Sequence, residues 1–428
     1  MSGFEAQVYQ NEYLPSGADT VDAVVTVKSL LGSGGYSSPV ATERVQMILL
    51  DTSGSMSEEQ GRKLWAAKQA TEAAVNAMAD GTWFALVGGN HGSYRIYPSS
   101  GLAKADSSTK AEAIYRLGSV RADGGTAIGS WIRTATELAR TKPNSIAHAI
   151  LLTDGHNEHE ADSVLDDAVA QAVGHFQCDV RGLGANWQVQ ELRRIGSALL
   201  GSVDIIPDPD DMEAEFTRLT DQAKTRSVGS VDLRLWTPKG SVTQLVKQVA
   251  PSLEDLMATG RQTKPMTTDY SLGAWSPNEE RDYHIRVQVP VGEVGDERLA
   301  ARVALVADGE EQPVALVRAV WTGDNVLSTR INREVAHYTG QAELADVIHD
   351  GLAARSRGDD DVATMKLGRA VQIAYESGND ETIKLLQNVV KVEDAGSGTI
   401  RLRRDVDKTA EMTLDVRSVR TVRVGKVD

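Results

Sequence analysis

The stretch "ILLDTSGSM" (residues 48–56) decides the fold of this chain. Three aliphatic residues run without a break into Asp51, and the hydroxyl residues Ser53 and Ser55 follow one residue apart. Aliphatic runs without polar alternation are typical of strands that are buried on both faces, as in a parallel sheet. The stretch therefore predicts a buried strand whose carboxyl end leads directly into a polar binding loop.

Residues 43–226 continue this pattern as a repeat of strand and helix. The aliphatic runs "VQMILLD", "WFALVGG" and "IAHAILLTD" alternate with amphipathic segments. The "SEEQ" sequence at Ser57 predicts a capping box that starts a helix over 57–80. Pro209 after Asp208 predicts a second, capped helix start. Strands joined by helices indicate an α/β fold, with a mostly parallel sheet covered by helices on both faces.

The segments on either side of this region alternate with the period of a strand instead. Valines and alanine alternate over residues 20–30, and four further sets of alternating aliphatic residues occur within 228–321. The first two of these sets are Val231, Leu233 and Leu235, and Ile285, Val287, Val289 and Val291. One or two N-terminal strands are not stable alone, so we expect them to complete a β-sandwich into which the α/β domain is inserted.

The C-terminal part of the chain divides into a helical and a basic segment. Residues 332–392 have helical periodicity with two breaks, which predicts three helices, either as a packing domain or as a groove for a partner. The last segment carries eight Lys or Arg and five Asp or Glu, and its aliphatic residues alternate, so we expect edge strands or a partly ordered tail. The expected order is N-terminal strands, α/β domain, β-sandwich, helical domain and basic tail, at residues 1–42, 43–226, 227–325, 326–395 and 396–428.

Composition excludes several classes of protein. The net charge of −15 over 428 residues argues against binding to nucleic acid or to an anionic membrane, because such binding uses clustered Lys and Arg. Cys178 is the only cysteine, so a disulfide framework within the chain is excluded. The N-terminus has no signal-peptide pattern, and no stretch is long and apolar enough to span a bilayer. We therefore expect a cytoplasmic protein.

Two further loops bring oxygen-bearing side chains to the edge at which the first strand ends. Thr126 follows two glycines in "RADGGTAIG", and Asp154 ends the aliphatic run in "LLTDGHNE". Ligands of open α/β sheets bind at the carboxyl ends of strands, so we expect Thr126 and Asp154 to meet Asp51, Ser53 and Ser55. A shell of hydroxyls, carboxylates and water suits Mg²⁺ or Mn²⁺. With two carboxylates only, the ion would favour an anionic ligand from a partner.

The histidines after Asp154 allow a different metal, which we discount. "HNEHE" contains His156, Glu158 and His159, but the spacing H-x-x-H does not place both imidazoles on one helical face, and no third zinc ligand is evident. We instead assign Gly125, His156 and Glu158 to the rim of the Mg²⁺ site, where they would contact a partner. Histidine on this rim would make binding sensitive to pH.

Over roughly 43–226 the chain resembles a von Willebrand factor type A domain with a complete metal-ion-dependent adhesion site. The family pattern is D-x-S-x-S, a distant Thr and a distant Asp, which "DTSGS", "GGT" and "TDG" match in order. The resemblance implies a Rossmann-like fold. It also implies that Ser53, Ser55 and Thr126 bind the ion directly, while Asp51 and Asp154 bind it directly or through water.

The whole layout also resembles intracellular bacterial proteins that join such a domain to a β-sandwich and C-terminal helices. Relatives of this kind are associated with ATPase, kinase, phosphatase or tellurite-resistance-type stress systems. The resemblance implies a partner from such a system.

Two functions follow from these observations. The first is a binding module, not an enzyme, that holds a carboxylate of a partner protein through the bound ion. The second is a hydrolase or phosphoryl-transfer enzyme that uses the ion as a Lewis acid. The second needs a positioned base or nucleophile, for which the sequence offers only His156 and Glu158.

Overall fold

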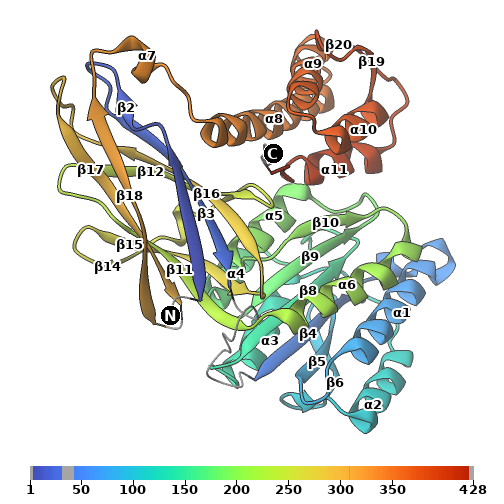
Figure 1. The fold of residues 1–428 in the computed structure, drawn as a ribbon. Helices are drawn as coiled ribbons and strands as arrows, with labels where there is room; N and C mark the ends of the chain where they lie inside the picture. The colour runs from blue at the N-terminus through green and yellow to red at the C-terminus, as the bar shows by residue number, and fades with distance from the viewer. Residues whose placement is uncertain (1–2, 31–42, 308, 424–428) are drawn as a thin grey trace. The chain divides into compact units, whose positions relative to one another are not determined.

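The computed structural model describes residues 3–30, 43–307 and 309–423, and its contacts divide the chain into two units. The first unit combines Met1–Ser37 with Ser230–Asp428, and the second is Ser38–Gly229 (Figure 1). The loop expected at 31–39 lies outside the described residues.

The second unit is built on a mostly parallel sheet of seven strands. Its order is β10-β9-β8-β4-β5-β6, with β7 also paired to β5. The pairs from β10 to β5 are parallel, and β6 and β7 run antiparallel to β5. The strands are β4 (Arg44–Asp51), β5 (Trp83–Gly89), β6 (Ser93–Tyr97), β7 (Ala103–Lys104), β8 (Ile146–Thr153), β9 (Gln177–Leu183) and β10 (Val203–Ile206).

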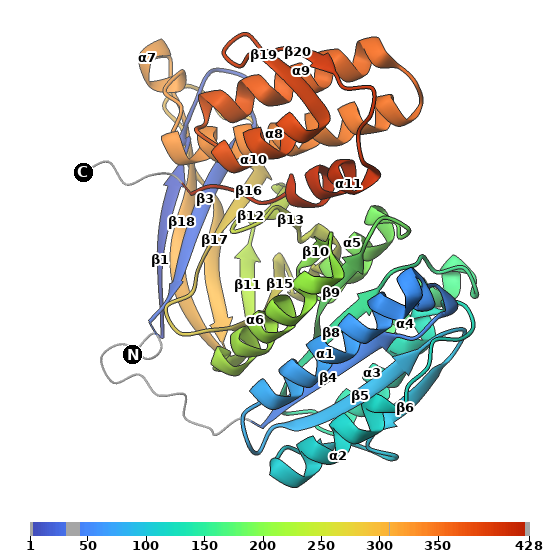
Figure 2. The same cartoon turned by 90° about the vertical axis from the view of Figure 1, so that its right-hand side faces the viewer.

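Helices cover both faces of this sheet (Figure 2). Buried side chains of α1, α2 and α6 form one core with Ile48, Leu50 and Ile150 of the central strands. The remaining helices, α3, α4 and α5, lie against the opposite face. The helices are α1 (Arg62–Ala77), α2 (Ser107–Gly118), α3 (Ile128–Arg140), α4 (Asp162–Ala172), α5 (Val189–Ala198) and α6 (Met212–Thr225). The α/β fold expected from the sequence is confirmed.

The strand order places a topological switch point beside β4. The chain passes from β4 to β5 on one side and later enters β8 on the other side. Ligands of open α/β sheets bind at the carboxyl ends of such strands. Asp51 is the last residue of β4, and Asp154 directly follows β8.

The expected capping box of the first helix is wrong. Residues 54–61 form two short 3₁₀ turns, η1 (Gly54–Ser57) and η2 (Glu59–Gly61), and α1 begins at Arg62. Glu59 and Gln60 have positive φ, so the chain cannot enter an α-helix there. The second expected start is confirmed, because Asp208 caps the turn η3 (Pro209–Asp211).

The first unit contains two sheets made from segments that are far apart in the sequence. The N-terminal strand β3 lies between β1 and β16, and β2 pairs with β18. The first sheet has the order β1-β3-β16-β12-β13 and contains β1 (Phe4–Gln10), β3 (Thr20–Ser29), β12 (Val242–Ala250), β13 (Glu254–Asp255) and β16 (Glu280–Gln288). The second has the order β14-β15-β11-β17-β18-β2 and contains β2 (Tyr13–Leu14), β11 (Val228–Trp236), β14 (Arg261–Lys264), β15 (Thr267–Trp275), β17 (Glu297–Ala307) and β18 (Glu310–Trp321).

Most of the expected inward-facing residues of these sheets are buried. Val231, Leu233 and Leu235 are at most 1% exposed. Val291 is an exception: it is 55% exposed, because β16 ends at Gln288 and the alternation does not continue past that point.

The C-terminal region is helical, and the basic segment at its end is part of the fold. The short helix α7 (Asn325–Ser328) precedes the three expected helices, α8 (Arg333–Ser356), α9 (Asp360–Glu376) and α10 (Asp380–Val389). The segment expected as a separate tail at 396–428 instead provides the hairpin strand β20 (Thr399–Leu402), paired with β19 (Val390–Asp394), and the helix α11 (Lys408–Arg417).

Burial and backbone contacts explain why this segment is not a tail. Ile400 and Leu414 lie in the helical core, with Leu414 fully buried. Val419 accepts a backbone hydrogen bond from Leu253, and Thr421 donates one to Pro251. None of the described helices is both long and apolar enough to cross a membrane.

Candidate metal site

Asp51 is a fully buried carboxylate at the end of β4. One carboxylate oxygen accepts a hydrogen bond from the backbone N–H of Ser53 at 2.8 Å, and the other accepts one from the hydroxyl of Thr153 at 2.7 Å. Burial raises the pKa of Asp51 to about 6; the charge of Asp154 acts in the same direction, and the hydrogen bonds act against it. The arrangement fixes the carboxylate in place, and no Lys, Arg or His side chain among the described residues forms an ion pair with it.

Three hydroxyls and a second carboxylate gather in front of Asp51. Ser53 Oγ lies 3.0 Å from Ser55 Oγ, and Ser55 Oγ donates to Asp154 Oδ1 at 2.6 Å. A Cβ built on Gly155 would lie 3.2 Å from Thr126 Oγ1 and 4.0 Å from Ser55 Oγ. The hydroxyls of Ser55 and Thr126 therefore point toward the same space beside Gly155.

Backbone contacts join the two loops that carry these hydroxyls. The N–H of Gly54 donates to the carbonyl of Gly124 at 2.8 Å, and the N–H of Asp123 donates to the carbonyl of Thr52 at 2.8 Å. A Cβ at Gly124 would overlap the ring of His91, and its φ of +80° favours glycine. Glycine at this position therefore allows the loop to turn beside the ring of His91.

A lysine ammonium also contacts the site, which the sequence analysis did not anticipate. Lys63 of α1 donates to Asp154 Oδ2 at 2.8 Å and to Glu58 at 2.7 Å. The side chain of Lys63 is 8% exposed and that of Asp154 is fully buried, whereas Glu58 is more than half exposed. Lys63 therefore neutralises the charge of Asp154, and the charge of Asp51 is the one left over.

The expected rim residues lie in the same two loops but have different roles. His156 Nε2 lies 3.2 Å from Glu158 Oε1, and both side chains are more than a third exposed. A Cβ at Gly125 would overlap the ring of His159, whose Nδ1 accepts a hydrogen bond from the N–H of Thr126 at 3.1 Å. His156 and Glu158 therefore face solvent, whereas His159 holds the backbone of Thr126.

The donor set suits a hard divalent cation. Hydroxyl and carboxylate oxygens are ligands of Mg²⁺ and Mn²⁺. Within the described parts of the chain, no three His, Cys, Asp or Glu side chains are grouped to hold a metal, so an ion here would depend on the hydroxyls. The contact between Ser53 Oγ and Ser55 Oγ, and the space that Ser55 and Thr126 share beside Gly155, place the three hydroxyls close enough to bind one ion.

The structure brings together the five residues that the sequence predicted, Asp51, Ser53, Ser55, Thr126 and Asp154. It adds Thr153, which orients Asp51, and Lys63. A signal for Lys63 is present in the sequence, because Lys63 lies four residues before Ala67 and so falls on the buried stripe of α1. A lysine on a buried stripe requires an acidic partner.

Comparison with known families identifies two matching segments. A model described as "von Willebrand factor type A domain" matches residues 46–205, and one described as "von Willebrand factor type A C-terminal domain" matches residues 372–418. The second match covers α10, β19, β20 and α11, which agrees with the packing of the basic segment into the helical region.

Comparison with individual proteins extends the similarity to the whole chain. The chain is 43% identical to a solved structure, "von Willebrand factor type A from Catenulispora acidiphila", with a TM-score of 0.91 over 99% of this chain and 97% of that one. The paralog of ArnB named VWA2 from Sulfolobus acidocaldarius shares the fold, with a TM-score of 0.58 at 13% identity over 98% of both chains. An uncharacterized protein of Synechocystis is 25% identical over 236 residues, 55% of this chain, and the chain spans about half the length of that relative.

Proposed function

The chain belongs to the von Willebrand factor type A family, and on that premise we propose that it is a protein-binding module that uses a divalent cation. The cation would be Mg²⁺ or Mn²⁺, held by Ser53, Ser55 and Thr126, with Asp51 and Asp154 bound directly or through water. The observation that carries the proposal is the convergence of these hydroxyls and Asp154 at the switch point of the sheet.

The charges of the site explain why the ligand would be a carboxylate. A bound cation would offer an open position to an anionic oxygen, because the hydroxyl ligands are neutral. Lys63 already compensates Asp154, so only the charge of Asp51 remains to offset that of the ion. The partner would therefore present an Asp or Glu, with His156 and Glu158 at the rim contacting the residues around it.

Without the cation, the same site would repel a carboxylate. The sequence alone suggests that a partner would then face both Asp51 and Asp154. The ammonium of Lys63 reduces this to the charge of Asp51. One like-charge contact at about 4 Å and an effective dielectric near 20 costs on the order of 4 kcal/mol.

A capture experiment tests the proposal. The immobilised protein is incubated with lysate in Mg²⁺ or in chelator, and the bound proteins are identified by mass spectrometry. We expect a partner that is retained in Mg²⁺, lost in chelator and lost from Thr126→Ala. A partner that binds equally to the wild type in Mg²⁺, to the wild type in chelator and to Thr126→Ala would refute a role for the site.

The hydrolase alternative rests on one contact. Glu158 lies 3.2 Å from His156, as an orienting carboxylate would beside a general base. Turnover of phosphate esters or peptides with Mg²⁺ or Mn²⁺, abolished in His156→Ala, would favour the enzyme over the binding module.

We extend the proposal to the chain as a whole. The pairing of β3 with β16, with 38–229 lying between them in the sequence, supports an α/β unit inserted into a β-sandwich. We place the activity in the cytoplasm because Cys178 is the only cysteine, with a partner from a bacterial stress-response system.

A further inference from the structure

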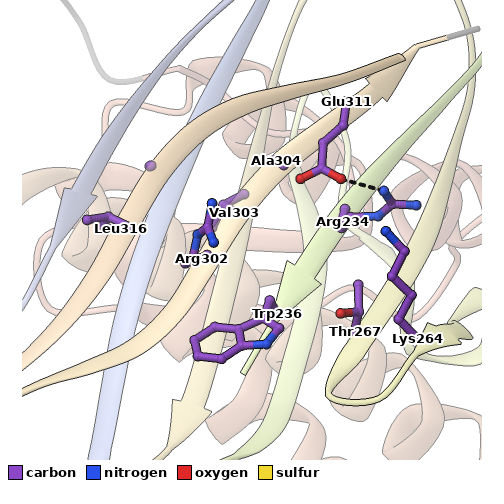
Figure 3. Close-up of a pocket in the computed structure, with 10 residues that line it drawn as sticks. Arg234, Trp236, Lys264, Thr267, Arg302, Val303, Ala304, Glu311 and Leu316 are labelled. Carbon is purple, nitrogen blue, oxygen red and sulfur yellow. Dashed lines mark hydrogen bonds and ion pairs between the residues drawn. The ribbon is translucent and has the colours of Figure 1, made fainter. Parts of the chain in front are cut away.

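A hollow of about 330 Å³ lies on the six-stranded sheet of the first unit, separate in sequence from the candidate metal site (Figure 3). It is lined by residues of β14, β15, β11, β17 and β18. On β11, Arg234 and Trp236 alternate with the buried Leu233 and Leu235, so the hollow is on the face of the sheet that points away from its core.

The cations that line the hollow are of two kinds. Arg234 is fully occupied, since it donates to both oxygens of Asp269 at 2.7 Å and to Glu311 at 2.6 Å. Lys264 and Arg302 are exposed, and among the described residues neither forms an ion pair or a side-chain hydrogen bond. Lys264 and Arg302 are therefore available to an external anion.

Apolar groups lie beside these two cations. Trp236 is paired directly with Arg302 across the strands β11 and β17, and Arg302 is paired with Leu316 of β18. Leu316 is 47% exposed, and Ala304 and Ala315 are small enough to leave the hollow open. An exposed leucine and a tryptophan beside unpaired cations favour a ligand that combines apolar groups with negative charge.

The span of the hollow across the sheet fits an extended peptide. From Lys264 on β14 to Leu316 on β18 the lining crosses four spacings between strands, or about 19 Å at about 4.8 Å each. An extended peptide of about six residues covers this length at about 3.3 Å per residue.

We propose that this hollow binds an extended, acidic segment of a partner protein, with its carboxylates at Lys264 and Arg302 and its apolar side chains on Trp236 and Leu316. This site would work independently of the metal site, because all of its lining residues belong to the first unit. Binding would weaken as salt is added, since the attraction is between exposed charges.

The test uses the full-length protein in chelator, so that any binding through a divalent cation is removed. The probe is a fluorescent hexapeptide, acetyl-Leu-Glu-Glu-Leu-Glu-Leu amide, and its matched control carries glutamine at the three glutamate positions. We expect fluorescence anisotropy to detect the acidic probe and to show binding at least about tenfold weaker for the control.

Protein variants locate the site. The double variant K264A/R302A should weaken the acidic probe by about tenfold, because two exposed ion pairs are lost. K366A/R369A is the matched control: it removes one Lys and one Arg from the exposed side of α9 and should bind as the wild type does. Both pairs are on the surface, so both variants should fold, which circular dichroism verifies.

Three results would overturn the proposal. They are equal binding of the acidic and glutamine probes, undiminished binding by K264A/R302A, and displacement of the probe by inorganic phosphate at equal concentration. The last result would show that the hollow takes a free anion, not a peptide. None of these results depends on the metal site, and failure of Mg²⁺ binding elsewhere would leave this test unaffected.

Discussion

Replacing Lys63 with Met should destabilise the metal-free protein and make it more responsive to Mg²⁺. Lys63 forms a buried ion pair with Asp154, whose side chain is fully buried. Removing one partner of such a pair leaves an uncompensated charge, at a cost of about 3–5 kcal/mol. The lost contact to the exposed Glu58 adds no more than about 1 kcal/mol.

Mg²⁺ should reverse part of this loss. In the wild type, a cation at the site meets the ammonium of Lys63 beside Asp154. In Lys63→Met that repulsion is gone and Asp154 carries its full charge, so Mg²⁺ binds more tightly. A ligand at about 100 times its dissociation constant stabilises the folded state by about 2.7 kcal/mol, which is a large part of the expected loss.

Urea denaturation in chelator and in Mg²⁺ measures both effects. Lys68→Met is a matched control on the same helix, because Lys68 donates to the backbone carbonyls of Gly118 and Val120 and forms no ion pair within the described part of the chain. We expect the control to show no difference in its response to Mg²⁺ relative to the wild type. The reasoning fails if Lys63→Met is as stable as the wild type in chelator, or if Mg²⁺ stabilises it less.

Three further variants test predictions about stability. Leu414→Ala should lower the free energy of unfolding in urea by about 2–5 kcal/mol, because Leu414 is fully buried. Removal of 399–428 should abolish the cooperative unfolding transition of the first unit. An unchanged urea midpoint for either variant would show that this segment is dispensable. Burial alone would raise the pKa of Glu215, but the hydrogen bond from Arg218 and the charge of Arg181 outweigh it and hold the pKa at about 2. The stabilisation that follows from this lowered pKa is fully present above the unfolded pKa of about 4.3 and is lost as the pH falls toward 2. Glu215→Gln should therefore lower the free energy of unfolding by about 3 kcal/mol at pH 7 and by almost nothing near pH 2. A loss of stability that does not change with pH would contradict this prediction.

The sequence predicted the parts of the fold that depend on periodicity and on the ends of strands. The aliphatic run before Asp51 and the one before Asp154 identified the two strands at the switch point, and their neighbouring hydroxyls identified the site. These signals are local, and each is contained within about ten residues.

The sequence did not predict features that depend on contacts between distant segments. Lys63 meets Asp154 across 91 positions, and only the folded sheet brings them together. The alternating valines and leucines of the basic segment predict edge strands, or else a partly ordered tail. Met412, Leu414 and Val416 belong to this segment. These residues instead lie in α11, which Asp407 caps, because packing against the other C-terminal helices outweighs the alternating pattern.

The central claim is that Ser53 and Ser55 hold a divalent cation, and calorimetric titration with Mg²⁺ tests it most directly. We compare the wild type, S53A/S55A and Ser57→Ala. The hydroxyl of Ser57 donates to the carbonyl of Gly54 in the same loop and, among the residues that the structure describes, makes no contact with the proposed ligands. We expect the wild type and Ser57→Ala to bind Mg²⁺. We expect no binding by S53A/S55A. This variant should lose about 1.5–3 kcal/mol of stability in chelator, because Ser55 donates a hydrogen bond to the buried carboxylate of Asp154. Equal affinity of the wild type and S53A/S55A for Mg²⁺ would contradict the account.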